Sequence, residues 1–185
     1  GSVAVTINKA DAVCTIGGYS GIYDANAHGA SGSCTGVDSG TAAGGTLDLG
    51  TSFTNVPGGT ATWSFTGGTN YKNQTGSVAI TINKADAVCT ITGHSGIYDA
   101  NAHGASGNCT GVDSGAAAGG SLDLGASFTN VPGGSANWSF TGGGNYKDQT
   151  GSVAITINKA DAVCTINGYV GAFDANSHGA SGSCA

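Results

Sequence analysis

The chain has 185 residues, 35 of them Gly, and its 5 basic against 11 acidic side chains give a net charge of −6. This balance excludes a typical nucleic-acid-binding protein, because neutralising several phosphates requires clustered Lys and Arg. No apolar run reaches the roughly 18 residues that span a bilayer, so we expect no membrane insertion, and the abundance of Gly and β-branched residues excludes a long helical bundle.

The predicted elements are short strands separated by turns rich in Gly, Asn, Asp and Pro. In chain order, the first complete set is Ala12–Ile16, Gly32–Val37, Thr46–Leu49, Ser52–Val56, Thr60–Thr66 and Ser77–Asn83. The fifth strand alternates most clearly, with Ala61, Trp63 and Phe65 predicted to face the core. Strands of this length and number predict an all-β fold, a small Ig-like β-sandwich, with a small open barrel or a β-grasp-like sheet as alternatives.

These strands recur because the chain is a tandem repeat with a period of 75 residues. The segment that begins at Gly1 returns at Gly76 and at Gly151. Residues 1–75 and 76–150 differ at eleven positions and need no insertion or deletion to align. Copies this similar must fold alike, and such repetition is typical of a spacer, stalk or fibre.

The predicted domain boundary lies at the Asn-Lys-Ala-Asp junction between two consecutive strands. We therefore expect residues 1–9 to be the last strand of a preceding repeat, 10–84 and 85–159 to be two complete β domains, and 160–185 to begin a third repeat. The chain is then expected to continue into further repeats or to self-associate, since an incomplete sheet edge invites pairing with another strand.

Each repeat contains two cysteines that lie 20 positions apart. They are Cys14, Cys34, Cys89, Cys109, Cys164 and Cys184. Repeat symmetry leaves two simple pairings, one bridge within each domain or bridges that link Cys34 to Cys89 and Cys109 to Cys164. We favour the bridges within domains because they pair all six cysteines, and each would stabilise its domain by roughly 3 kcal/mol.

A disulfide framework predicts an oxidising compartment and hence an extracellular, secreted or surface-attached protein. The alternative is a zinc site made of Cys14, Cys34 and His28, but the chain has no Cys-x-x-Cys pair. We therefore expect no metal and no cofactor.

A polar turn near the start of each repeat contains Asp24, Asn26 and His28 in the first copy. We expect these side chains to cap the turn, because a calcium loop of the EF-hand kind needs a Glu that the chain lacks. Asp24, His28 and Ser31 could be combined on paper into a hydrolase site, yet no oxyanion site is indicated, so no enzyme is expected. Tyr19, Tyr23 and Tyr71 lie near turns and could stack on surface glycans.

Three runs in the repeat resemble a known family: GYSGIYDANAHGA from Gly18, LGTSFTNVPGGTATWSF from Leu49 and SVAITINKA from Ser77. They are similar to the MBG/YDG-type repeats of large secreted bacterial surface proteins. The resemblance implies an extracellular, tandemly repeated β domain of adhesins or fibres, in which the cysteine pair is a departure. We therefore expect a non-catalytic structural protein of an extracellular filament or cell-surface stalk; the alternative is an adhesion module that binds glycan or a host or abiotic surface.

Overall fold

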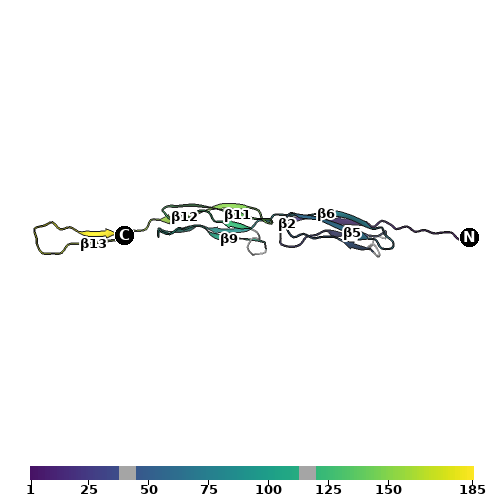
Figure 1. The fold of residues 1–185 in the computed structure, drawn as a ribbon, viewed down its shortest axis with the longest axis horizontal. Helices are drawn as coiled ribbons and strands as arrows, with labels where there is room; N and C mark the ends of the chain where they lie inside the picture. The colour runs from purple at the N-terminus through teal and green to yellow at the C-terminus, as the bar shows by residue number, and fades with distance from the viewer. Residues whose placement is uncertain (38–44, 113–119) are drawn as a thin grey trace. The chain divides into compact units, whose positions relative to one another are not determined.

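The computed structural model describes residues 1–37, 45–112 and 120–185 (Figure 1). These residues form strands, turns and loops, and no helix occurs among them, so the all-β prediction is confirmed. The chain divides into two compact units. The first comprises Gly1–Thr90, Gly107–Asp123 and Trp138–Gly151, and the second comprises Ile91–Ser106, Leu124–Asn137 and Ser152–Ala185.

The strands repeat along the chain as the sequence does. The first repeat contains β1 (Val13–Gly17), β2 (Tyr19–Ile22), β3 (Ser31–Thr35), β4 (Thr46–Asp48), β5 (Gly58–Thr66) and β6 (Gln74–Asn83). The second contains β7 (Val88–Thr92), β8 (His94–Ile97), β9 (Ser106–Thr110), β10 (Ser121–Asp123), β11 (Gly133–Thr141) and β12 (Gln149–Asn158). The remaining strands are β13 (Cys164–Asn167) and β14 (Ser181–Cys184).

Each complete repeat combines a four-stranded sheet with a two-stranded one. The larger sheet has the order β2-β6-β5-β4 in the first repeat and β8-β12-β11-β10 in the second. Strand β2 runs parallel to β6, whereas β4 and β6 run antiparallel to β5. The larger sheets curl into half-barrels. The smaller sheets are the antiparallel pairs β1-β3 and β7-β9.

The core of the first repeat is formed by alternate residues of the long strands and by the cysteines. In β5, Ala61 and Phe65 are buried and Trp63 is half-buried, so the predicted inward face is confirmed. Cys34 of β3 packs in the same cluster as Phe65, which brings the smaller sheet against the larger one. In β6, which pairs with a strand on each of its edges, Ile80 is 1% exposed.

The prediction of a strand at Ser52–Val56 is wrong. Only Phe53 pairs there, in an isolated bridge with His28. The Phe53 ring packs on Gly59, where an added Cβ would lie 2.4 Å from a ring carbon. The segment is held by this side chain and continues into a turn, in which the Gly58 N–H donates to the Asn55 carbonyl. Conversely, β2 was not predicted, because a four-residue strand that contains Gly carries almost no periodic signal.

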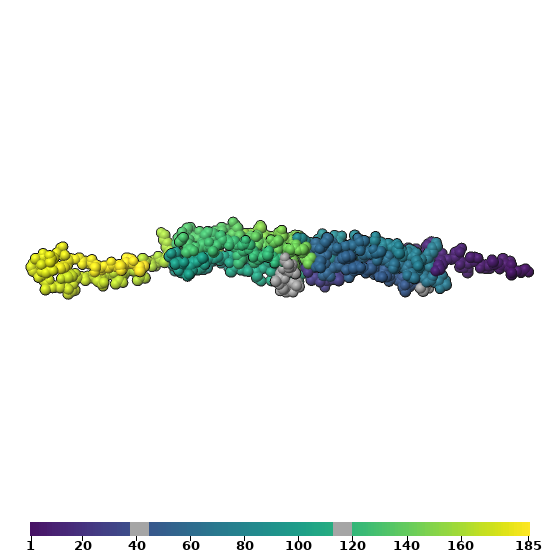
Figure 2. Space-filling view, viewed as in Figure 1, coloured from purple at the N-terminus to yellow at the C-terminus, as the bar shows by residue number. Residues whose placement is uncertain are grey.

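The two ends of the chain lack the sheet partners that the complete repeats have. Residues 1–9 contain no strand, and Figure 2 shows them in purple as a thread without neighbours on its sides. Their apolar side chains Val3, Val5 and Ile7 are 87–92% exposed. At the other end, β13 and β14 pair only with each other and are exposed throughout. No helix capable of crossing a membrane is found in the part of the chain that the structure describes.

Candidate functional site

The cysteines lie directly opposite each other on paired strands. Cys14 of β1 faces Cys34 of β3, and the disulfide between them is 2.03 Å long. The equivalent bonds join Cys89 to Cys109 and Cys164 to Cys184, so each bridge lies within one repeat and none links two repeats. Three disulfides in a chain of this size indicate an oxidising environment.

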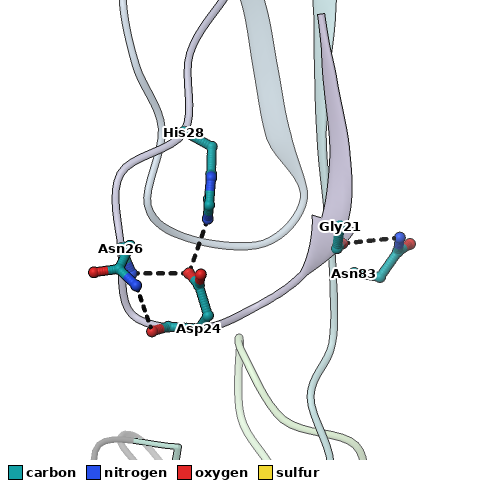
Figure 3. A network of polar contacts seen from close by, with 5 residues as sticks. All are labelled: Gly21, Asp24, Asn26, His28 and Asn83. Carbon is teal, nitrogen blue, oxygen red and sulfur yellow. Dashed lines mark hydrogen bonds and ion pairs between the residues drawn. The ribbon is translucent and has the colours of Figure 1, made fainter.

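The polar turn after β2 is organised around the Asp24 carboxylate (Figure 3). Its Oδ1 lies 2.8 Å from His28 Nε2 and accepts a hydrogen bond of 2.9 Å from the Asn26 backbone N–H. The hydrogen bond with His28, followed by those with Asn26, lowers the pKa of Asp24 to about 2. Beside the turn, Asn83 Nδ2 donates to the Gly21 carbonyl and ties β6 to β2.

This turn recurs in all three copies, including the incomplete one. The Asp99–His103 and Asp174–His178 contacts measure 2.9 and 2.7 Å. A second ring stacks on the histidine each time: Tyr19 on His28, His94 on His103 and Tyr169 on His178, with centroids 3.7–4.0 Å apart. The exchange of Tyr19 for His94 between repeats therefore preserves a flat ring at this position.

The residues considered for catalysis or glycan stacking do not gather into one site. No hydrogen bond joins Ser31 to Asp24 or His28 within the described residues. Tyr23 and Tyr71 are buried, so these two rings do not add to Tyr19 as an exposed aromatic platform. Groups of three or more potential metal ligands are not found in residues 1–37, 45–112 and 120–185.

A polar site of the first unit is built around a loop that we call the Asn-Tyr loop, Gly142–Asp148. The loop closes on itself: the Tyr146 N–H donates to the Gly142 carbonyl, and the Gly142 N–H donates to Asp148 Oδ1. A Cβ added at Gly142 would lie 2.3 Å from the Tyr146 carbonyl oxygen, so only glycine fits there. The equivalent loop of the first repeat is Gly67–Asn73.

The residues that connect β6 to β7 bind this loop through three hydrogen bonds. We call Lys84 and Ala85 the linker. Lys84 Nζ donates to the Gly143 carbonyl (2.8 Å), and the Ala85 N–H donates to the Asn145 carbonyl (2.9 Å). The Ala85 carbonyl in turn accepts from the Lys147 N–H (2.9 Å). Ala85 is 2% exposed, so these backbone bonds are shielded from water.

The Asn-Tyr loop also contacts the end of the first repeat, within the same compact unit. The Val56 N–H donates to Asn145 Oδ1 (3.0 Å), and Asn145 Nδ2 donates to Asn55 Oδ1 (2.9 Å). The ring of Tyr23 meets the ring of Tyr146 edge to face, with centroids 5.5 Å apart. Asn145 thus satisfies a backbone donor of the preceding repeat while its own carbonyl is held by the linker. We call Tyr23, Asn55, Val56 and the linker together the socket.

The first linker, Lys9 and Ala10, repeats the backbone part of this arrangement. Lys9 Nζ donates to the Gly68 carbonyl (2.7 Å), and the Ala10 N–H donates to the Asn70 carbonyl (2.9 Å). The Lys72 N–H donates back to the Ala10 carbonyl (2.9 Å). Each of these linkers therefore binds the Asn-Tyr loop of the repeat that follows it.

Sequence reasoning did not find this site. Asn145 and Asn55 lie 90 positions apart, and neither residue type marks an interface by itself. The two copies are so similar that comparing them cannot separate contact residues from the rest. No protein-family model matches the chain, and no curated protein matches it.

Proposed function

We propose that the chain is a non-catalytic structural protein, a string of disulfide-closed β domains within an extracellular filament or cell-surface stalk. The observation that carries the proposal is the linker contact. The same three hydrogen bonds occur at Lys9–Ala10 and at Lys84–Ala85, although the first linker follows no folded repeat among the described residues. A repeat that binds the linker preceding it is suited to a chain in which such repeats follow one another.

The contacts of Asn145 add a reason to expect stiffness at the junction. A Gly-rich linker would let neighbouring domains reorient freely, whereas here a side chain of one repeat bonds Asn55 and Val56 of the preceding one. We expect this junction to resist bending. The similarity to MBG/YDG-type repeats and the disulfides support secretion, and 10–84 and 85–159 are proposed as the two Ig-like domains.

Electron microscopy of native material tests the proposal. Regular filaments whose length increases by a constant step for each added 75-residue repeat would support it. Isolated flexible stalks that end in a distinct tip domain would contradict it and favour the adhesion module, and binding to a glycan array would do the same. The double variant Lys84→Ala/Asn145→Ala should bend more sharply at its junction. The matched control is Lys72→Ala, which removes only an exposed ion pair with Asp11.

A further inference from the structure

A cavity of about 410 Å³, largely open to solvent, lies in the second unit and is lined by Tyr98, Asn130, Val131, Lys159 and Ala160. Each of these residues stands 75 positions after a residue of the socket: Tyr23, Asn55, Val56, Lys84 and Ala85. The cavity is therefore the second copy of the socket, at the end of the second repeat. No atoms of an Asn-Tyr loop occupy it.

The two sockets differ in exposure and in hydrogen bonding, as expected if only the first is covered by an Asn-Tyr loop. Tyr23, whose ring packs on Tyr146, is 8% exposed, whereas Tyr98 is 41% exposed. The Val56 N–H donates to Asn145 Oδ1, while the Val131 N–H has no hydrogen-bond acceptor among the described residues. Asn55 and Asn130 differ likewise, since only Asn55 receives a side-chain bond. The second socket thus presents a backbone N–H without an acceptor in the described chain beside a partly exposed aromatic ring, the two groups that the Asn-Tyr loop covers in the first socket.

The linkers indicate which loop would fill it. Both linkers with a complete repeat after them bind the loop of that following repeat, and Lys159–Ala160 lead into the segment that begins the next copy. A second molecule fits less well. Its own Ala10 already occupies the Asn70 carbonyl and the Lys72 N–H, the backbone groups that Ala160 would need.

We propose that this cavity binds the Asn-Tyr loop of the repeat that residues 160–185 begin, a loop of the sequence Gly-Gly-x-Asn-Tyr-Lys. The loop asparagine accepts from the Val131 N–H and donates to Asn130, Lys159 Nζ donates to a loop glycine carbonyl, and the loop tyrosine covers Tyr98. This inference rests on the proposed function, because it assumes repeats connected in series.

Amide hydrogen exchange at Val131 tests the proposal, because this N–H is the donor that the loop would satisfy. In the unmodified chain, Val131 should exchange at least about tenfold faster than Val56. Appending a copy of residues 111–159 after Ala185 completes the third repeat and should slow Val131 to about the rate of Val56. Replacing the loop asparagine of the appended copy with Ala should restore fast exchange at Val131.

The existing junction provides a test that does not depend on folding of the appended segment. Asn145→Ala should accelerate Val56 exchange about tenfold and leave Val131 unchanged, whereas Asn70→Ala should change neither, since the Asn70 side chain makes no contact with a socket. Equal exchange at Val56 and Val131 in the unmodified chain would overturn the proposal. Val131 exchange that stays fast beside a folded third repeat, shown by protected amides in its appended strands, would overturn it too.

Two further outcomes separate this inference from its alternatives. Protection of Val131 that rises with the concentration of the unmodified chain would assign the socket to a second copy and overturn the proposal. Protection in the extended chain combined with flexible stalks under the microscope would support the loop contact while contradicting the filament.

Discussion

Residues 1–8 and 76–83 have the same sequence except for Val5 in place of Ile80, yet only the second segment is a strand. Ile82 in β6 is 1% exposed, whereas the matching Ile7 is 92% exposed. Strand β6 pairs with β5 on one edge and β2 on the other, while residues 1–8 have no neighbouring strand in the described chain. The alternating pattern therefore gives a segment the capacity to be a strand, and its neighbours supply the hydrogen bonds and the apolar cover.

The incomplete third repeat shows which elements need no such neighbours. Strands β13 and β14 pair around the Cys164–Cys184 disulfide without a larger sheet beside them. By contrast, residues 169–172, which match β2, form no strand where an equivalent of β6 is absent. Hairpin pairing and the polar turn are thus local, whereas the parallel β2–β6 contact depends on the complete repeat.

The largest difference is expected from truncating the two matched isoleucines. Ile82→Ala should destabilise its repeat by about 4 kcal/mol, because it removes a fully buried side chain and leaves a cavity. Ile7→Ala should change the free energy of unfolding by less than about 0.5 kcal/mol. Urea denaturation of the two variants measures both values. Equal losses would mean that residues 1–8 are covered in solution.

Removing disulfides should have the next largest effect and again differ between complete and incomplete repeats. Cys14→Ala/Cys34→Ala should cost the first repeat about 3 kcal/mol through the loop entropy of the unfolded chain. Cys164→Ala/Cys184→Ala should leave the unfolding of the complete repeats unchanged, since this hairpin buries no apolar core. Thermal unfolding with and without reductant measures both variants, and peptide mapping without reductant verifies the pairing. If Cys164→Ala/Cys184→Ala also destabilised the first repeat, the incomplete repeat would not be independent of the complete ones.

Glycines at equivalent positions offer a smaller contrast. A Cβ at Gly76 would lie 2.6 Å from the ring of Trp63, whereas nothing lies within 4 Å of Gly1. Gly76→Ala should destabilise the first repeat by about 2 kcal/mol, because the ring must move out of its packed position. Gly1→Ala should be neutral. Tryptophan fluorescence during denaturation follows this ring, and an unshifted midpoint for Gly76→Ala would show that Trp63 adapts without cost.

The smallest effect concerns the polar turn, which we expect to be independent of the sheet. The hydrogen bonds with His28 and Asn26 lower the pKa of Asp24 to about 2, and the equivalent bonds from Asn176 and His178 lower the pKa of Asp174. Because the folded pKa lies below the ordinary value of 3.8, the turn stabilises the protein above that pH. This contribution is lost as the pH falls toward 2.

NMR titration of the carboxyl carbons measures the pKa values directly. Both carboxyl groups should titrate below 3.8, and His178→Ala should raise the pKa of Asp174. An ordinary pKa for Asp174 beside a lowered one for Asp24 would mean that the turn requires the sheet after all.

The sequence predicted those parts of the fold that depend on local pattern. The alternation of Ala61, Trp63 and Phe65 located β5 and its inward face, and the preference for a pairing that uses all six cysteines selected the bridges within repeats. Alternation could not distinguish Ile7 from Ile82, because burial depends on strands distant in sequence. Pattern also failed at Phe53, whose ring packs on Gly59 instead of extending a ladder. The socket was beyond prediction, since it joins an asparagine to a backbone N–H 89 positions away.

The linker contact is compatible with a gene that lengthens by duplication of whole repeats. Socket and Asn-Tyr loop occupy different places in one 75-residue unit, so the contact is heterologous and does not close on itself. An in-register duplication of the unit supplies one further linker, loop and socket together, already matched to their neighbours. Unequal recombination therefore lengthens or shortens the array without any compensating mutation. Selection for the length of the array can then act on the number of repeats alone.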